Sequence, residues 1–421
     1  MTAKKAILAC LGVIAIAIAL TTVAHRIADE RRQDGLDAFY ATPADVDSAQ
    51  PGDVLRIESL ASAPVPGARS YRLLYRSEQP DGSPGVSGAI AVIPTGPAPA
   101  DGRPVLAWAH GTIGLGRGCA PSRRSDPLQA TPWMADAVSN GFAVVATDYT
   151  GLGTAGPNGY LVGRAEALDV IDSVRALDQV PGAQASRRWT VMGHSQGGHA
   201  ALWTGAVAPI ELPERPLIGI AAGAPAANLS AIVDLQWDTG IGWDVGAYIN
   251  ESWPVIYPDA GIESAVSWLG QRYSTPVADA CLGEGLPVPP VLGAIAAVVG
   301  FPFFNENPNS DPQLAAIAVA QTPKPLPSSL PVLIAQGTAD TIVPPQTNAA
   351  TQVDWCAAGS DLTMNWLGGV GHVAAGPIIG SLGIPWLRAL YDGAKPQPHC
   401  RFVPPVPVAR TPLIDAYDLG A

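Results

Sequence analysis

Short apolar runs recur along the chain, and turn residues such as glycine and proline bound each of them. The runs lie at residues 104–110, 142–148, 189–193, 217–222, 331–336 and 362–367. Because they show little alternation of polar and apolar positions, they are typical of strands buried on both faces of a parallel sheet. Two further strand-like segments, 71–75 and 89–94, flank Pro80-Asp81-Gly82 and predict an antiparallel hairpin.

Helical patterns lie between several of these strands. In the clearest one, apolar residues follow helical spacing at Ala167, Val170, Ile171, Val174 and Leu177. Acidic residues occupy its other faces, at Glu166, Asp169, Asp172 and Asp178. Buried strands that alternate with amphipathic helices predict an α/β fold with a mostly parallel, doubly wound sheet. No element is predicted for residues 30–66, which are polar and rich in turn residues.

One interval breaks this alternation. Residues 226–330 separate two predicted sheet strands, and a connection of this length is unusual. We expect it to form a large helical cap inserted before the last strands. Its apolar stretch at 291–304 is too short to span a membrane. That stretch either receives an acyl chain or belongs to a core of the cap itself, and the two roles are compatible.

The N-terminus has the pattern of a targeting segment. Lys4 and Lys5 precede an apolar run at 6–24, and polar sequence follows. Residues 1–24 are predicted to be a signal peptide, which leaves one domain at 25–421. The run is also long enough to remain as a signal anchor, and residues 6–24 would then tether the protein to a membrane. In both cases we expect the domain to be secreted or associated with the cell envelope.

Composition narrows the range of functions. Of the 421 residues, 48% are hydrophobic and 14% are charged, so the chain can bury a large core in one domain with an insertion. The net charge of -12 argues against nucleic acids and anionic membrane surfaces as partners. Four cysteines follow the apolar N-terminal run, at Cys119, Cys281, Cys356 and Cys400, and an exported chain would form two disulfides from them in one of three pairings. Their spacing fits no zinc site, and neither a metal nor a cofactor is expected.

The pentapeptide Gly193-His194-Ser195-Gln196-Gly197 fits the G-x-S-x-G nucleophile elbow of the α/β-hydrolase fold. A predicted strand leads into it, and a helix-compatible segment at 198–207 follows. The glycines would allow a tight strand-to-helix turn in which backbones approach closely. Such a turn holds the Ser195 hydroxyl clear of the sheet and lets the backbone N–H of Gln196 stabilise an oxyanion. We therefore predict that Ser195 is a nucleophile.

A serine nucleophile needs a base, and in this fold the acid and then the histidine follow the serine along the chain. Only His372 and His399 lie beyond the last predicted strands. His372 follows the strand at 362–367 through a glycine-rich turn, whereas His399 lies in a proline-rich tail. This position predicts His372 as the base.

Asp340 is the predicted acid. It follows the strand at 331–336 through a short turn, so it should lie at the same sheet edge as Ser195 and orient the imidazole of His372. Asp354 and Asp361 are alternatives that lie farther from the strand end. A purely structural role for Asp340, as a turn residue, is the other interpretation.

The second oxyanion donor is expected in the loop that begins His110-Gly111-Thr112, directly after the strand at 104–109. We predict the backbone N–H of Thr112 as this donor. His110 is interpreted as a support for the loop. Asp148, at the end of another strand, is interpreted as a structural turn residue.

With these residues the chain resembles the secretory lipase family of α/β-hydrolases, in its bacterial branch. The resemblance also rests on Cys119-Ala120-Pro121-Ser122 and on the order of the segments along the chain. The resemblance implies that the protein is a secreted lipase or esterase with a serine–aspartate–histidine triad. It also implies a lid that is inserted late in the sheet. It further implies the disulfides Cys119–Cys281 and Cys356–Cys400, the first of which would tie the oxyanion loop to the cap. Gln196 departs from family elbows that have a smaller residue at this position, which bears on substrate preference.

The predicted function is hydrolysis of small or lipid carboxylic esters through an acyl-enzyme on Ser195. An acyltransferase on the same scaffold is the alternative among enzymes, and peptidase activity lacks recognition residues. A non-catalytic surface protein that retains the fold is the alternative outside enzymes. The complete, ordered set of Ser195, Asp340 and His372 argues against it.

Overall fold

A computed structural model describes residues 28–129, 131–283 and 288–409. The chain divides into two units, Met1–Ala41 and Thr42–Ala421. In the first unit residues 28–40 are helical. The predicted signal segment at 1–24 lies outside the described residues. Everything below concerns the second unit.

The described residues of this unit form one nine-stranded sheet in the order β1-β2-β3-β5-β4-β6-β7-β8-β9. The strands are β1 (Val54–Ser59), β2 (Ala68–Glu78), β3 (Pro84–Pro94), β4 (Arg103–Ala109), β5 (Ala143–Thr147), β6 (Ala185–His194), β7 (Leu217–Gly223), β8 (Val332–Gly337) and β9 (Leu362–Leu367). Strands β1, β2, β3 and β5 pair antiparallel in succession. All pairs from β5 through β9 are parallel. The predicted hairpin is confirmed as β2 and β3.

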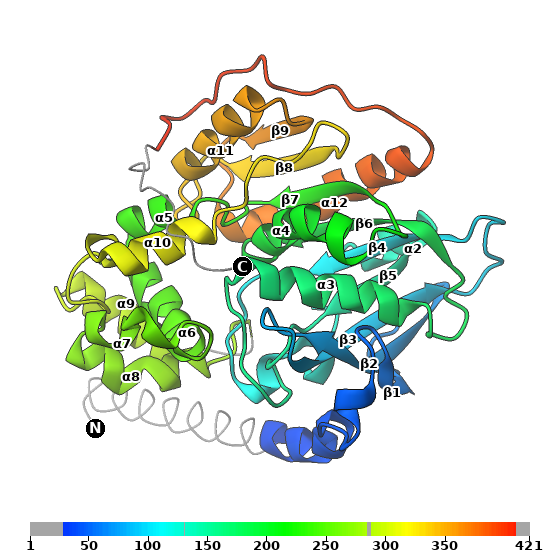
Figure 1. The fold of residues 1–421 in the computed structure, drawn as a ribbon, viewed down its shortest axis with the longest axis horizontal. Coiled ribbons are helices and arrows are strands. Elements are labelled where there is room, and N and C mark those ends of the chain that lie inside the picture. Colours follow the sequence, from blue (N-terminus) through cyan, green and yellow to red (C-terminus); the bar gives the residue numbers. More distant parts are fainter. Residues whose placement is uncertain (1–27, 130, 284–287, 410–421) are drawn as a thin grey trace, which may run out of the picture. The chain divides into compact units, whose positions relative to one another are not determined.

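Helices cover both faces of the sheet (Figure 1). On one face, residues of α3 (Gly163–Leu177), α4 (Gln196–Glu211) and α11 (Pro345–Ala357) share a core with the strands. On the other face, α2 (Met134–Ser139) and α12 (His372–Tyr391) do so. Among the described residues, α12 alone is long and apolar enough to cross a membrane, but Ile379 and Leu387 on it are fully buried in the protein core. The architecture is the predicted α/β-hydrolase fold.

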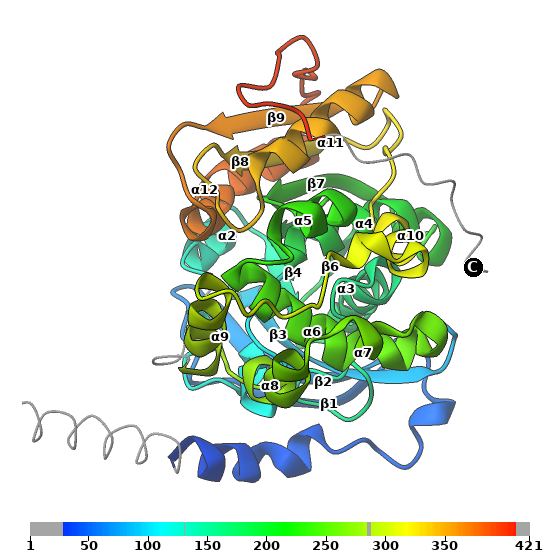
Figure 2. The same cartoon turned by 90° about the vertical axis from the view of Figure 1, so that its left-hand side faces the viewer.

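The interval between β7 and β8 is helical. It contains α5 (Leu229–Gln236), α6 (Gly240–Ile256), α7 (Ile262–Ala265), α8 (Trp268–Ala278), α9 (Val288–Val298) and α10 (Pro312–Ala320). Short 3-10 turns η4 (Pro258–Ala260) and η5 (Pro308–Ser310) join some of them, and others lie earlier in the chain as η1 (Val46–Ser48), η2 (Arg117–Cys119) and η3 (Pro121–Arg123). Figures 1 and 2 show helices α5–α10 as one group beside the sheet. We call this group the cap.

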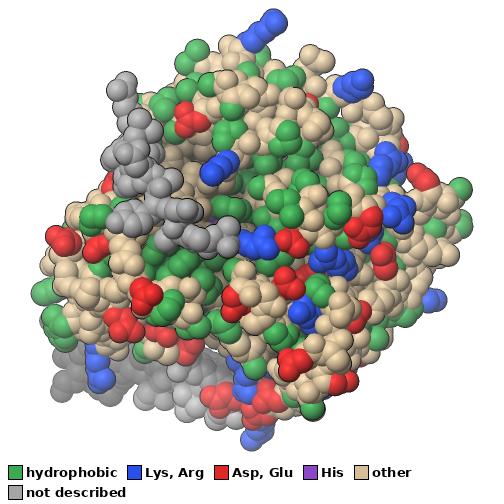
Figure 3. All heavy atoms as spheres, viewed as in Figure 1, with side chains coloured by type: hydrophobic (Ala, Val, Ile, Leu, Met, Phe, Trp, Pro, Cys, Tyr) green, Lys and Arg blue, Asp and Glu red, His purple; other side chains and the backbone are tan. Residues whose placement is uncertain are grey.

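The cap helices pack around a hydrophobic core that Tyr160, Leu161 and Val162, from the segment before α3, also join. Trp243, Trp253 and Phe303 are buried in it, and the rings of Trp243 and Phe303 lie 5.3 Å apart, edge to face. The apolar stretch at 291–304 has two parts. Phe303 and Phe304 at its end pack in this core, while Val298 and other residues of α9 are exposed. Figure 3 shows hydrophobic and acidic side chains interspersed on the side of the cap that faces the viewer.

Two features of the fold differ from the sequence prediction. Strand β1 lies in the region for which no element was predicted, because its side chains are half-buried or exposed and form no apolar run. Helix α3 buries its acidic side chains as well as its apolar ones, since Glu166, Asp169 and Asp172 are all buried. Their carboxylates accept hydrogen bonds from neighbouring segments, which a periodicity argument cannot detect.

Candidate active site

Ser195 occupies the turn between β6 and α4. Its backbone has φ 60° and ψ −120°, a conformation that is strained for a residue with a Cβ atom. The flanking glycines explain how the turn fits. A Cβ atom on Gly193 would lie 2.0 Å from the carbonyl oxygen of Gly197, and one on Gly197 would lie 1.9 Å from that of Ala109. Both positions therefore exclude any larger residue, as the elbow prediction required.

The structure brings Ser195, His372 and Asp340 together. The Oγ atom of Ser195 lies 2.8 Å from Nε2 of His372. Nδ1 of His372 lies 2.7 Å from Oδ2 of Asp340. This geometry lets the serine hydroxyl donate to a neutral imidazole whose other nitrogen donates to the carboxylate. The alternative histidine, His399, instead contacts the carbonyl oxygen of Met364 in β9.

Asp340 also makes the turn contacts expected of a structural residue. Its Oδ1 accepts hydrogen bonds from the backbone N–H groups of Ile342 and Val343, each at 2.9 Å. Gln336 donates to Oδ2 at 3.2 Å. These turn contacts are compatible with the predicted role of Asp340 as the acid, because one oxygen is fixed by the turn while the other faces His372. The carboxylate is thereby held in one orientation.

His194 supports His372 from the nucleophile turn, a contact that the sequence did not indicate. Its Nε2 lies 3.0 Å from the carbonyl oxygen of His372, and the two rings lie 4.8 Å apart. Burial, and secondarily the neighbouring His372, lowers the pKa of His194 to about 4. His194 is therefore neutral near pH 7, and its Nε2–H donates to the first residue of α12.

The loop after β4 lies against the nucleophile. A Cβ atom on Gly111 would lie 3.3 Å from the Cβ of Ser195. Thr112 follows, and its hydroxyl lies 2.8 Å from the hydroxyl of Tyr160. Thr112, Tyr160 and Gln196 line one small pocket. The two predicted oxyanion residues therefore border the same space.

Buried polar groups hold the base of this loop. The ring nitrogens of His110 lie 2.7 Å from the carbonyl oxygen of Gly111 and 3.2 Å from that of Asp148. Burial lowers the pKa of His110 to about 4. The Asp148 carboxylate accepts hydrogen bonds from the backbone N–H and the hydroxyl of Ser122. These contacts are structural, as the sequence interpretation of both residues proposed.

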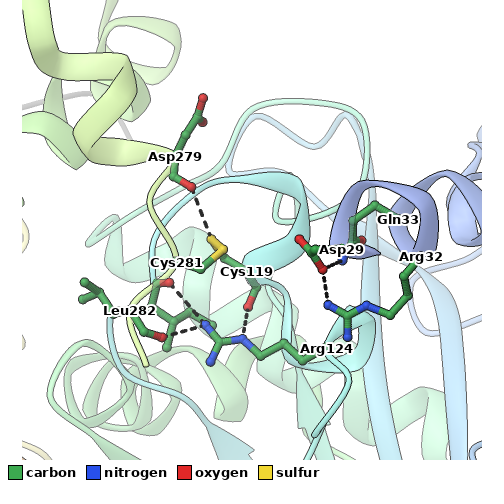
Figure 4. Close-up of a disulfide and its surroundings, with 9 residues drawn as sticks. Asp29, Arg32, Gln33, Cys119, Arg124, Asp279, Cys281 and Leu282 are labelled. Atoms are coloured by element: carbon green, nitrogen blue, oxygen red, sulfur yellow. Dashed lines mark hydrogen bonds and ion pairs between the residues drawn. A yellow bond between two sulfur atoms is a disulfide. The ribbon is translucent and has the colours of Figure 1, made fainter. Parts of the chain in front are cut away.

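A disulfide joins the oxyanion loop to the cap (Figure 4). The structure pairs Cys119 with Cys281 and Cys356 with Cys400, the pairing that the family resemblance implied. Arg124 reinforces the first bridge, because its guanidinium donates to the carbonyl oxygens of Cys119 and Leu282, each at 3.0 Å. Part of the cap is thus fixed to the segment that follows Thr112.

Comparisons with known proteins relate the chain to lipases. The sequence model of the family described as "Secretory lipase" matches residues 129–242 and 316–398. "Lipase 2" of Candida albicans is 26% identical, over 86% of this chain and 82% of its own length. The "Secreted triacylglycerol lipase LIP7" of Malassezia globosa is 24% identical, over 93% of this chain and 85% of its own.

Solved structures show the same fold. The X-ray structure of Candida antarctica lipase A in its closed state has a TM-score of 0.68 at 20% identity, with 88% of each chain covered. The rice cell wall degrading esterase LipA from Xanthomonas oryzae has a TM-score of 0.66 at 19% identity, with 82% of this chain and 98% of its own covered. The chain therefore has the α/β-hydrolase fold, and over residues 129–242 and 316–398 it is similar to the secretory lipase family.

Proposed function

We propose that the protein hydrolyses carboxylic esters through an acyl-enzyme on Ser195, with His372 as the general base and Asp340 as the residue that orients it. The contacts of 2.8 Å and 2.7 Å that join the three side chains carry this proposal. The observed chain order of serine, aspartate and histidine supports it.

In the first half-reaction, Ser195 Oγ attacks the ester carbonyl carbon while its proton passes to His372 Nε2. The carbonyl oxygen becomes an oxyanion, which accepts hydrogen bonds from the backbone N–H groups of Gln196 and Thr112. Gln196 is the first residue of α4, where the N–H has no partner within the helix. The C–O bond then breaks, and His372 returns the proton to the leaving alcohol.

In the second half-reaction, water attacks the acyl-enzyme with His372 again as base. The carboxylic acid is released and the Ser195 hydroxyl is restored. Throughout, the Asp340 carboxylate keeps the proton of His372 on Nδ1 and stabilises the imidazolium. The described side chains therefore account for every proton transfer.

A pocket within the cap fits the acyl part of a lipid ester. It is partly open and almost entirely apolar. Residues of α5, α6, α7 and α10 line it, among them Ile232, Val245, Ile249 and Leu314. An apolar lining of this kind suits an alkyl chain rather than a polar ligand. Lipid esters are accordingly the proposed substrate class.

We also propose that the protein works outside the cytoplasm, secreted or tethered through residues 6–24. Two disulfides support an oxidising compartment. Membership of the family's bacterial branch stays a prediction, since the curated relatives named above are fungal.

The first experiment is hydrolysis of p-nitrophenyl esters with acyl chains from short to long, by the purified protein and by Ser195→Ala. Turnover that is lost in Ser195→Ala is the expected result, and the preferred chain length separates esterase from lipase. Absence of Ser195-dependent turnover on every ester, from protein with a cooperative thermal transition, would overturn the proposal. Acyl transfer to an added alcohol would then be measured, and labelling of Ser195 by a fluorophosphonate would separate a transferase from a non-catalytic protein.

A further inference from the structure

Glu166, on the first turn of α3, is a buried carboxylate that the reaction above does not use. Its side chain is 2% exposed. Oε1 accepts hydrogen bonds from Nε2 of Gln196 at 2.8 Å and from the backbone N–H of Leu161 at 2.9 Å. Oε2 lies 2.8 Å from Nδ1 of His199. A buried carboxylate is costly unless several donors surround it, and these three partners surround Glu166.

The two donors to Oε1 are Gln196, which lines the small pocket beside Thr112, and Leu161, which follows the lining residue Tyr160. Gln196 carries one proposed oxyanion N–H. Leu161 follows Tyr160, whose hydroxyl lies 2.8 Å from that of Thr112, the other proposed oxyanion residue. Leu161 has a φ of 53°, which a leucine rarely adopts, so its hydrogen bond to Glu166 helps to hold a strained turn. One oxygen atom thus bonds both to Gln196, which lines the pocket, and to the residue after Tyr160, which also lines it.

His199 extends this arrangement to the cap. Its Nε2 lies 2.7 Å from the carbonyl oxygen of Gln321, directly after α10, and its side chain is fully buried. A carbonyl oxygen can only accept, so Nε2 must carry a proton. The contact with Glu166 needs a second proton, either on Nδ1 of His199 or on the carboxyl group. In both states the pair of side chains is neutral in total.

Gln321 also uses its side chain at this junction. Its Oε1 accepts from the backbone N–H of Gly163 in α3 at 2.9 Å, and its Nε2 donates to the hydroxyl of Tyr257 in the cap at 2.8 Å. Glu166, His199 and Gln321 therefore form a continuous buried path from the cap to the nucleophile turn.

We propose that Glu166 is a positioning residue that holds both halves of the oxyanion hole, with His199 linking it to the cap. The inference rests on the proposed function, because it concerns the geometry of that reaction's oxyanion site. It also gives a physical reason for the unusual size of Gln196: its amide, together with His199, holds α4 to Glu166.

The test compares Glu166→Ala with Glu166→Gln on a soluble p-nitrophenyl ester. The alanine variant removes the acceptor shared by Gln196 and Leu161, and we expect kcat to fall at least about tenfold while KM changes less than about twofold. The glutamine variant can keep all of the hydrogen bonds, since its Oε1 accepts from Gln196 and Leu161 while its Nε2–H donates to a neutral His199. It should recover most of the lost kcat.

A transition-state readout separates positioning from general stability. An alkyl boronic acid forms a tetrahedral adduct with a serine hydroxyl, so its affinity should fall in Glu166→Ala in parallel with kcat/KM. Asp172→Ala is the matched control, because it deletes another buried carboxylate of α3, one that bonds to Ser77 and Arg175 instead. We expect it to lower the thermal midpoint without changing the kcat of the folded protein.

If Glu166→Ala does not fold, Gln196→Met carries the test, since it removes the amide anchor but keeps the backbone N–H and most of the side-chain volume. It should also lower kcat and boronate affinity at nearly constant KM. Unchanged kcat and boronate affinity in folded Glu166→Ala, or in Gln196→Met, with Ser195-dependent turnover intact in the wild type, would overturn the inference alone. Loss of Ser195-dependence in the wild type would overturn the proposed function instead.

Discussion

His372 Nε2 lies 2.8 Å from Ser195 Oγ, although 177 residues separate the two along the chain. The contact forms because β6 and β9 run parallel in one sheet, so the segments that leave their carboxyl ends meet at one edge. α4 begins just after Ser195, and α12 begins at His372. Asp340 enters from the loop after β8, between them in the sheet order. The contact between these side chains thus depends on strand order more than on any local motif.

Asp340→Asn should lower kcat by about 10³- to 10⁴-fold. An amide in place of Oδ2 can donate toward His372 Nδ1, which stabilises the imidazole tautomer that cannot accept the Ser195 proton. Steady-state kinetics on a soluble ester would measure the loss. Asp354→Asn, at an exposed position on α11, is the control and should leave kcat unchanged. Equal effects of the two substitutions would show that Asp340 acts only as a turn residue.

The double variant Cys119→Ser/Cys281→Ser should lose about 2–4 kcal/mol of unfolding free energy. It should also lose kcat/KM, since the bridge fixes the segment after Thr112 to the cap. Cys356→Ser/Cys400→Ser is the matched control, because it removes a disulfide that joins α11 to the C-terminal region. It should lower stability without lowering kcat/KM. Denaturant unfolding and ester kinetics on both variants check this, and a loss of kcat/KM in both would contradict it.

Chain order and strand ends allowed Ser195, Asp340 and His372 to be predicted from the sequence, because an apolar strand marks where each following loop must lie. Glu166 could not be predicted in the same way. Its position on a helix with alternating apolar and acidic residues indicates a solvent-facing side chain, whereas its partners come from α4 and the segment before α3. Likewise, β1 lacks an apolar run and depends on pairing with β2. The sequence does not reveal hydrogen bonds between polar groups that come together only after the elements pack.

Stability should fall as the pH rises through the range in which buried Asp169 ionises. Burial raises the pKa of Asp169 to about 7 from its usual 3.8. Between these values the folded state holds the proton and the unfolded state does not, so raising the pH favours unfolding. Asp169→Asn does not titrate, and its free energy of unfolding should fall less between pH 5 and pH 8 than that of the wild type. Denaturant titrations at both pH values measure this, and Asp354→Asn should behave as the wild type. An identical pH dependence in Asp169→Asn would contradict the assignment.

Val245→Trp should shift the acyl-chain preference toward short esters. Val245 lies on α6 and lines the apolar pocket of the cap, so an indole at this position fills space that a long alkyl chain would need. We expect kcat/KM to fall about tenfold or more for long-chain p-nitrophenyl esters and to change little for the butyrate. Val255→Trp introduces the same side chain on the same helix, at an exposed position outside the pocket lining, and should leave the preference unchanged. The thermal midpoint of each variant tests whether the larger residue is accommodated. A parallel loss on short and long esters in stable Val245→Trp would mean that this pocket does not hold the acyl chain.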